Sequence, residues 1–258
     1  KEETSLVTIA PSGSGKSQCQ VIPNLLFWEY SAVVLDVKGE LYKATAKRRR
    51  KFGKVYKFDI FDTSGNGNKF NPFQFIRTDF EHLWDDAGFL ASMMLLPQPA
   101  SDPYWQRAAK NVIHGILAAM VLDSISLKKK QGTEGPRSID YVLDALADRK
   151  ILEKVADTLC SYKAEIKPAW RVGCQLRDLI QKDEDTNSNM LHSILSQASI
   201  SLYDLGGKLV ENATSGCDWT PETLRKERST VYITLQSGRV EEFAALLRLV
   251  LGIHLRHY

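Results

Sequence analysis

The sequence predicts an α/β fold in which a mainly parallel sheet is interrupted by an all-α inserted domain. Three observations carry this prediction: strand-like and helix-like segments alternate over residues 5–61, helical periodicity dominates residues 78–205, and a strand-like run returns at 230–235. Alternating strands and helices are typical of parallel sheets, because each parallel pair needs a crossover connection.

Five elements are predicted in the first part of the chain. Runs rich in β-branched and apolar residues predict the strands, and apolar residues three and four positions apart predict the helices. In order, these are strand 5–10, helix 16–28, strand 32–36, helix 41–52 and strand 54–61. Pro23 lies inside the first helix and predicts a kink or an early end there.

The middle of the chain is predicted as helical, and strand character then returns. The expected helices are 87–96, 104–122, 139–146 and 189–202, with polar loops at 128–135 and 182–188. The run 230–235 predicts a strand, and a last amphipathic helix follows with one apolar face, made of Phe243, Leu246, Leu247, Val250 and Leu251. We therefore expect residues 1–77 and 206–258 to form one domain, and residues 78–205 to form the all-α insertion.

Composition excludes several classes of protein. A net charge of +3 over 258 residues, 43% of them hydrophobic, is ordinary for a soluble globular chain and excludes disorder and collagen-like structure. The four cysteines lie far apart, which argues against a zinc ribbon or a secreted disulfide scaffold and favours a reducing cytosol. The longest apolar run, 112–122, is shorter than the roughly 20 residues that span a bilayer. Because the chain opens on Lys1 rather than methionine, we expect it to start inside a longer protein.

Positive charge is concentrated in one stretch. Residues 38–57 hold nine basic side chains and one acidic one, a net charge of +8. Such a block can neutralise phosphates or meet an acidic partner. It can equally be the solvated face of a helix, because lysine and arginine are mostly exposed. Both interpretations stay open from the sequence alone.

The strongest functional motif is an octapeptide that fits A/G-x-x-x-x-G-K-[ST] between a predicted strand and a predicted helix. It is predicted to bind the phosphates of a nucleotide, and its residues are Ala10, Pro11, Ser12, Gly13, Ser14, Gly15, Lys16 and Ser17. Glycines let backbone N–H groups turn toward phosphate oxygens, and the helix that follows adds its positive dipole end. Lys16 would reach the β- and γ-phosphates, and the Ser17 hydroxyl would bind Mg²⁺.

Other segments of the sequence narrow the class of P-loop protein. The string 68–71 begins like a guanine reader but ends in asparagine rather than aspartate, so a GTPase is disfavoured. A small-molecule kinase does not usually carry so long a helical insertion. No run of four apolar residues ends in Asp-Glu, the usual Walker B strand of ATPases. Either Asp36, at the end of the strand 32–36, substitutes for it, or the true Walker B strand lies beyond Tyr258.

Several segments together resemble the type IV coupling proteins, the ATPases of conjugative DNA transfer and type IV secretion. Two markers are specific, Asp36-Val37-Lys38-Gly39-Glu40 and Ile22-Pro23-Asn24-Leu25-Leu26. The other similar stretches lie at 10–28, 32–49, 55–62, 70–73 and 229–255. The resemblance in sequence therefore covers both ends of the chain, and the middle is similar only in its helical character.

The resemblance implies a RecA-like P-loop domain with a membrane-distal all-α insertion. It further implies a homo-hexamer at the cytoplasmic face of the bacterial inner membrane, anchored by N-terminal helices absent from this chain, so residues 1–258 would be soluble. The implied ligands are ATP and Mg²⁺. The implied partners are single-stranded DNA with its relaxase or protein effectors, together with channel and adaptor proteins.

Residue roles follow by position. Gly13, Gly15, Lys16 and Ser17 would form the phosphate and Mg²⁺ site, and Asp36 would help order Mg²⁺ or be a turn residue at a strand end. The side chains of Arg48, Arg49 and Arg50 are candidates for an arginine acting in trans across a hexamer interface, against the alternative of a solvated helix. Since the Walker B pair is absent, residues 1–258 are expected to be inactive as an ATPase.

Two other functions are compatible with the sequence. The chain could be a recruitment platform whose insertion binds secretion partners without motor activity, or a DNA-translocating ring ATPase of the FtsK kind. The long helical insertion favours the coupling protein over the second alternative. Within that insertion Tyr104, Trp105 and Arg107 open a helix, where base stacking is conceivable but packing between helices is the favoured prediction.

Overall fold

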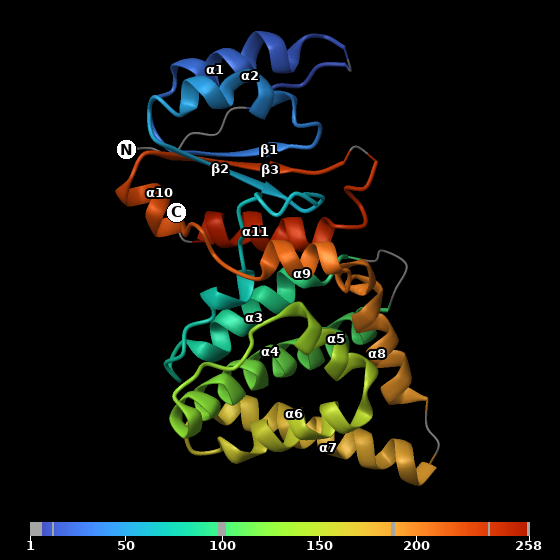
Figure 1. The fold of residues 1–258 in the computed structure, drawn as a ribbon. Coiled ribbons are helices and arrows are strands. Elements are labelled where there is room, and N and C mark those ends of the chain that lie inside the picture. The colour runs from blue at the N-terminus through green and yellow to red at the C-terminus, as the bar shows by residue number, and fades with distance from the viewer. Residues whose placement is uncertain (1–6, 12, 98–101, 187–188, 237, 257–258) are drawn as a thin grey trace. The chain divides into compact units, whose positions relative to one another are not determined.

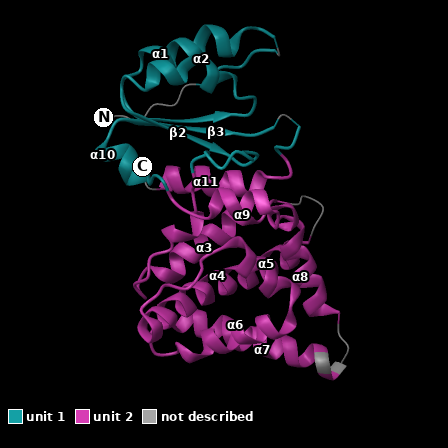
Figure 2. Cartoon of the chain, in the orientation of Figure 1, with its two compact units in different colours: residues 1–68, 218–240 teal, residues 69–217, 241–258 magenta. Residues whose placement is uncertain are grey.

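The structure is a computed structural model that describes residues 7–11, 13–97, 102–186, 189–236 and 238–256 (Figure 1). The chain divides into two compact units (Figure 2). Unit 1 comprises residues 1–68 and 218–240, and unit 2 comprises residues 69–217 and 241–258. The predicted domains 1–77, 78–205 and 206–258 stay a prediction, because compactness alone does not define a domain.

Three parallel strands form the sheet of unit 1. Their order is β1-β3-β2, with β1 (Ala32–Asp36) and β2 (Lys54–Asp59) on either side of β3 (Ser229–Thr234). Every residue of β3 is buried, as expected for the central strand of a parallel sheet. The predicted α/β class, with a parallel sheet interrupted by helices, is confirmed.

Helices of unit 1 pack on this sheet. A π-helical turn, η1 (Ser17–Val21), passes directly into α1 (Ile22–Phe27), and α2 (Glu40–Arg49) lies beside α1. The change of helix type falls next to Pro23, whose missing N–H suits the first turn of α1. Helical structure continues past Pro23 to Phe27, so the predicted early end is wrong, and the predicted kink stays a prediction. Together α1, α2 and the strands bury a small core of Leu25, Val34, Ala46 and Tyr232. The short α10 (Pro221–Lys226) leads into β3 and opens on a Thr220 capping box.

The predicted strand 5–10 is wrong for its described part. Residues 7–10 form no strand, and the side chains of Val7 and Ile9 are exposed; residues 5 and 6 lie outside the described residues. A β-branched run favours a strand only where another strand offers hydrogen-bond partners and a buried face. Residues 7–10, the part of the run that the structure describes, have neither, so local propensity did not decide their structure.

Unit 2 is helical throughout its described elements. Its 3₁₀ turns are η2 (Pro72–Phe75) and η3 (Tyr203–Leu205). Its α-helices are α3 (Leu83–Met94), α4 (Pro103–Gln131), α5 (Ile139–Ala147), α6 (Arg149–Ser161), α7 (Lys167–Thr186), α8 (Met190–Ile200), α9 (Lys208–Thr214) and α11 (Ala244–Arg256). The long α4 packs against α3, α5, α6, α7 and α8, which makes it the central helix of the unit.

Two predicted loops in unit 2 are partly wrong. Residues 128–131 extend α4, and residues 182–186 extend α7, while residues 187–188 lie outside the described residues. Both extensions are strongly polar ends of helices whose earlier turns are buried. Because a helix can continue into solvent once tertiary packing has formed its first turns, a polar composition did not mark the end of either helix.

The sequence reasoning did not identify α6 and α7, although α6 carries a clear signal. Leu152, Val155, Ala156 and Leu159 are buried along one side of α6, the spacing of an amphipathic helix. The two helices approach closely at Gly173, where an added Cβ would lie 2.8 Å from the Cβ of Leu159. Glycine at this position therefore permits the helix contact.

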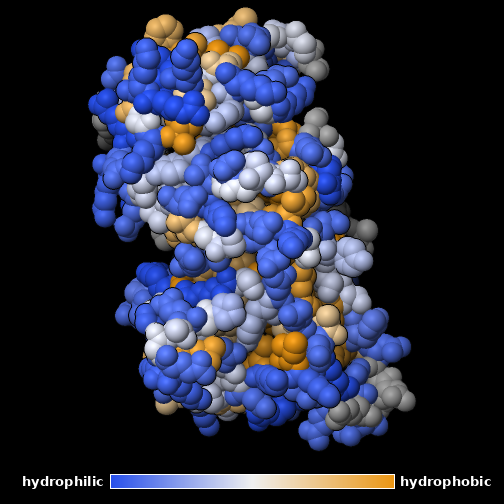
Figure 3. Space-filling model, viewed as in Figure 1, coloured by the Kyte–Doolittle hydropathy of each residue, from blue (hydrophilic) through white to orange (hydrophobic). Residues whose placement is uncertain are grey.

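One helix corrects an expectation about apolar length. Within the described residues, α4 alone is long and apolar enough to cross a membrane, although its uninterrupted apolar run, 112–122, is shorter than a membrane span. In its most apolar window, 67% of the residues are buried inside the protein. Such burial is typical of the core helix of a folded domain. Figure 3 shows that hydrophilic residues cover most of the visible surface, with apolar residues in separate areas between them.

Candidate nucleotide-binding loop

The predicted phosphate-binding loop forms a tight turn at the start of η1. Gly13 and Gly15 have φ angles of +80° and +81°, a conformation that side chains with a Cβ rarely adopt. The Ser14 N–H donates to the Pro11 carbonyl at 3.3 Å, and the Cys19 N–H donates to Gly15 at 2.8 Å. Ser12 lies outside the described residues. The two glycines thus occur where the backbone requires them.

Lys16 turns back onto the loop that precedes it. Its Nζ donates hydrogen bonds to the carbonyl oxygens of Ala10 and Pro11, the second at 2.7 Å. Ser17 begins η1 with its side chain exposed. The ammonium group is therefore held by two neutral oxygens of a surface loop, and a phosphate could replace them as its partner.

Asp36 ends β1 and is almost completely buried. One carboxylate oxygen accepts the backbone N–H of Tyr42 at 2.7 Å, which satisfies a free donor in the first turn of α2. The Asp36 carbonyl accepts the Gly39 N–H at 3.1 Å, and Gly39 adopts a φ of +68°. The structure therefore gives Asp36 a turn-forming role at the strand end. Among the bonds between described residues, none joins it to Lys16 or Ser17.

The three candidate arginines have different surroundings. Arg48 is exposed, lies over the ring of Phe52 at 4.6 Å, and donates to the Leu26 carbonyl at 3.3 Å. Arg50 is exposed and donates to the Tyr42 hydroxyl at 2.9 Å. Of the three arginines, only Arg48 and Arg50 have exposed side chains.

Arg49 is 1% exposed and belongs to the interior. Its Nε donates to Thr230 Oγ1 at 2.8 Å, and its remaining guanidinium nitrogens donate to main-chain oxygens of Leu25, Trp28 and Tyr30. Burial lowers the pKa of Arg49, and only the ionised form of Tyr232 would act in the opposite direction. The guanidinium thus ties α1 and the segment after it to β3.

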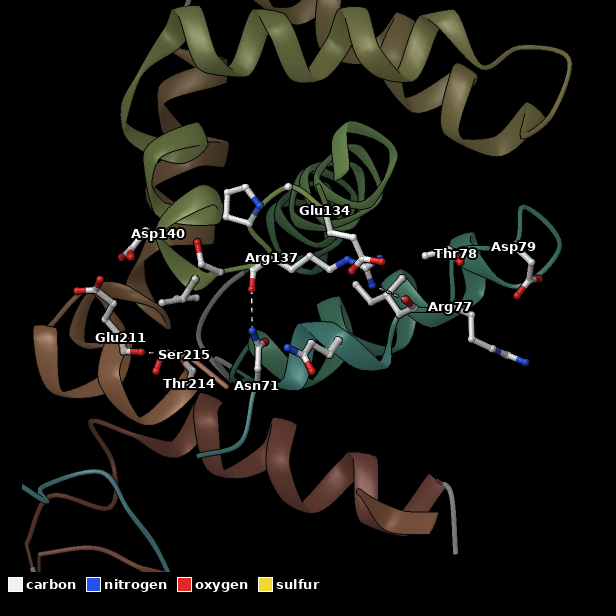
Figure 4. A pocket seen from close by; sticks show the side chains of 16 residues that line it. Asn71, Arg77, Thr78, Asp79, Glu134, Arg137, Asp140, Glu211, Thr214 and Ser215 are labelled. Atoms are coloured by element: carbon white, nitrogen blue, oxygen red, sulfur yellow. Dashed lines mark hydrogen bonds between the residues drawn. The ribbon is translucent and has the colours of Figure 1, made fainter. Parts of the chain in front are cut away.

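A second polar site, in unit 2, was missed by the sequence reasoning. A groove of about 950 Å³ runs between the segments 71–79, 134–140 and 211–215 (Figure 4). Figure 4 shows Asp140 and Glu211 toward one end, and Arg77 with Asp79 toward the other. Burial, and then the charges of Glu211 and Asp144, raise the pKa of Asp140. In the groove wall, Arg137 keeps a buried Nε for which no hydrogen bond is present among the described residues.

Tyr104 and Arg107, two of the residues considered for base stacking, lie at the surface near the start of α4. Tyr104 opens α4 with 54% of its side chain exposed, so the favoured prediction of core packing is wrong for this residue. Tyr104 and Arg107 line a smaller groove of about 370 Å³ against α7 and α8. Within the described part of the chain, no group of three or more His, Cys, Asp or Glu residues is arranged to hold a metal ion.

Comparison with known proteins identifies the family. The family model for type IV secretory system conjugative DNA transfer matches residues 3–258. The chain belongs to this family. The resemblance to type IV coupling proteins is thereby confirmed, and with it the link to conjugation, DNA transfer and type IV secretion.

Individual relatives of this coupling-protein chain are distant. The conjugal transfer protein TraG of Escherichia coli is 29% identical over 256 residues, 97% of this chain and 39% of TraG. Protein VirD4 of Rhizobium radiobacter is 24% identical over 255 residues, 96% of this chain and 34% of VirD4. The solved bacterial conjugative coupling protein TrwBdeltaN70 is similar at 13% identity and a TM-score of 0.43, over 89% of this chain and 51% of that one. The chain thus spans little more than a third of the curated relatives.

Proposed function

We propose that this chain is the ATP-binding part of a coupling protein. In this proposal the whole protein recruits DNA–protein or protein substrates to a type IV secretion channel and couples ATP hydrolysis to their transfer. The observation that carries the proposal is the loop 10–17, in which two left-handed glycines precede Lys16 at the start of a helix.

The residues of the loop would have separate roles. Lys16 would exchange the carbonyls of Ala10 and Pro11 for the β- and γ-phosphates of ATP, and the backbone of 13–16 would hold the remaining oxygens. The exposed Ser17 hydroxyl suits Mg²⁺, a hard cation that accepts oxygen ligands and keeps several waters or phosphate oxygens. Asp36 would act on the metal only through its second carboxylate oxygen, because the first is bonded to Tyr42.

Other parts of the proposal concern the longer protein. A homo-hexamer at the cytoplasmic face of the inner membrane would place an arginine of one subunit at the nucleotide of the next. Because Arg49 is buried, Arg48 and Arg50 are the candidates for that role. We further propose that the Asp-Glu pair needed for hydrolysis lies outside residues 1–258, so that this chain alone binds ATP without rapid turnover.

A recruitment platform is the second candidate function. The observation in its favour is the polar groove of unit 2, which is large enough for several side chains of a partner and is lined by both acids and arginines. Grooves lined by charged side chains favour a polar or charged segment of a partner protein. In this second proposal the nucleotide would only set the conformation of the chain.

ATP turnover tests the motor proposal. Residues 1–258 would be compared with a version extended by about 150 residues, with and without single-stranded DNA, and each with Lys16→Ala. We expect both versions to bind ATP, only the longer one to hydrolyse it with stimulation by DNA, and Lys16→Ala to abolish both activities. Removal of a P-loop lysine deletes a positive charge at the transferred phosphate, so a loss of at least about 100-fold in turnover is expected.

The opposite outcome is equally defined. If neither version turns over ATP while both bind a secretion partner, and Lys16→Ala leaves that binding unchanged, the motor proposal fails and the platform takes its place. Substitution of Glu211 by glutamine, in the groove of unit 2, would then weaken partner binding, whereas Glu165→Gln, at an exposed glutamate of unit 2 that does not line the groove, is the matched control.

A further inference from the structure

The last residue of α1 and the segment that joins α1 to β1 expose three aromatic side chains close together in the sequence. Phe27, Trp28 and Tyr30 are 79%, 53% and 62% exposed. The segment leads into Ala32, the first residue of β1, and thus lies at the amino ends of the parallel strands. Asp36 lies at the opposite, carboxyl edge of the same sheet. Large exposed aromatics that gather in this way mark interaction surfaces.

The fold holds this segment in a fixed conformation. Buried Arg49 donates to the carbonyls of Trp28 and Tyr30, and the Ser31 hydroxyl donates to the Leu224 carbonyl at 2.6 Å. Ser31 Oγ also accepts the Ser229 N–H at 3.1 Å, which ties the segment to the start of β3. The backbone is therefore anchored while the three rings point outward. Rigid aromatic side chains lose little conformational entropy on binding.

Two arginines lie against the same segment. The guanidinium of Arg228 lies 5.5 Å from the centroid of the Tyr30 ring and 3.6 Å from the Glu29 carboxylate. Arg48 donates to the Leu26 carbonyl at 3.3 Å, one residue before Phe27. Trp28 and Tyr30 contact each other edge to face at 5.3 Å between ring centroids. We call the set Phe27, Trp28, Tyr30, Arg48 and Arg228 the aromatic edge.

We propose that the aromatic edge binds single-stranded nucleic acid, with bases stacked on its rings and phosphates paired with Arg48 and Arg228. Exposed rings beside cations are the chemistry of sequence-tolerant single-strand binding. A duplex offers such rings no free base faces. The basic block 38–57, which includes Arg48, adds a field that attracts a polyanion to this part of unit 1. The proposal deepens the proposed function, since it names the surface that the transferred strand would contact.

Binding of a fluorescent thymidine 20-mer, followed by anisotropy, tests the proposal. The single variants Phe27→Ala, Trp28→Ala and Tyr30→Ala each remove one stacking surface, and Kd should rise about fivefold or more for each ring. Tyr203→Ala, which removes an 82% exposed tyrosine of unit 2, is the matched control and should leave Kd unchanged. The fluorescence of Trp28 should be quenched on binding, and this part of the quenching should disappear in Trp28→Phe.

The arginines are tested through salt. For single strands the logarithm of the binding constant falls with the logarithm of salt concentration by about 0.7 for each phosphate contact. The double variant Arg48→Ala/Arg228→Ala should therefore reduce this slope by about 1.4, while Lys129→Ala/Lys150→Ala in unit 2 should not alter it. Circular dichroism confirms that each variant is folded.

Three results would overturn the proposal. The first is unchanged oligonucleotide affinity in the ring variants. The second is a loss of binding to vesicles of anionic phospholipid in place of a loss of DNA binding, which would make the aromatic edge a membrane contact. The third is dissociation of oligomers by the same variants in light scattering, with DNA affinity unchanged. Failure of the proposed function would give a different result. In that case Lys16→Ala would not change ATP binding, whereas the oligonucleotide affinities of the ring variants would be unaffected.

Discussion

The two compact units bury charged side chains in opposite ways. In unit 1, Arg49 is buried among neutral acceptors, a threonine hydroxyl and three main-chain carbonyls. In unit 2, Asp86 is 2% exposed and accepts bonds from Arg77 at 2.7 and 2.9 Å and from Arg256 at 2.9 Å. Among the ion pairs of the described residues, none involves Arg49, whereas Asp86 is neutralised by two arginines.

The difference predicts different responses to acid. Burial of Asp86 opposes ionisation, but the hydrogen bonds and charge of Arg77, together with the charge of Arg256, outweigh it and hold the pKa of that carboxyl below its usual range. A guanidinium titrates far above neutral pH, so added protons leave Arg49 unchanged. The Arg49 guanidinium, which stabilises unit 1, therefore keeps its charge in acid, whereas the Asp86 carboxylate, which stabilises unit 2, loses its charge.

The largest effect is expected for Arg49→Leu. Leucine would leave the carbonyls of Trp28 and Tyr30 and the Thr230 hydroxyl without their donor, at about 1–3 kcal/mol for each group that stays buried. We expect the free energy of unfolding of unit 1 to fall by about 3–5 kcal/mol, measured by hydrogen exchange of the β3 amides. The neighbouring exposed Arg48→Leu should change it by no more than about 0.5 kcal/mol.

This result separates a structural arginine from a functional one. If Arg49→Leu were as stable as the unchanged protein, the buried guanidinium would not anchor the segment 27–31. If protection fell equally in α4 of unit 2, the two units would unfold together and the comparison would lose its basis.

A smaller effect is expected for Asp86→Asn. Asparagine keeps the shape of aspartate but lacks the negative charge that faces the guanidinium groups of Arg77 and Arg256. Breaking a buried ion pair costs about 3–5 kcal/mol. Because Arg77 is nearly half exposed and can be rehydrated, we expect a loss of about 2–3 kcal/mol in unit 2. Hydrogen exchange of α3 and α4 amides at pH 7 measures it.

The contribution of Asp86 to the stability of unit 2 should depend on pH in a defined direction. The folded pKa of Asp86 is below that of the unfolded chain, about 3.9, so its stabilisation is complete above that value and is lost as pH falls through it toward the folded pKa. Acid should therefore destabilise unit 2 of the unchanged protein below about pH 4, and this component should be absent in Asp86→Asn. It should persist in Arg49→Leu, and its absence there would contradict the assignment to Asp86.

The sequence predicted those elements whose signal is local. The run 32–36 is apolar up to its acid, and β1 has the predicted bounds. Residues 5–10 carry a similar run, yet Val7 and Ile9 are exposed, because strand formation depends on partners that are distant in sequence. In α6 the periodic signal is also local, because apolar residues three and four positions apart alternate with charged ones, and this helix was predictable from the sequence.

The site was predictable only in its contiguous part. Eight consecutive residues specify the loop 10–17, and its two positive φ angles follow from the positions of glycine. The burial of Arg49 depends on Thr230, 181 positions away, and no local pattern distinguishes it from Arg48 and Arg50. The aromatic edge likewise joins residues 27–30 to Arg228, which only the order of strands in the sheet brings together.

The smallest stability effect is expected for Lys16→Ala. Lys16 resembles Arg49 in that its cation is bonded to main-chain carbonyls, but its partners, Ala10 and Pro11, lie in a surface loop where water can replace the donor. The free energy of unfolding in urea should therefore change by no more than about 0.5 kcal/mol, while the binding of a fluorescent ATP analogue should be lost. A loss of more than about 1.5 kcal/mol would make Lys16 a structural residue like Arg49. Unit 1 would then hold two structural cations, and Lys16 would no longer be a cation that the fold leaves available for a ligand.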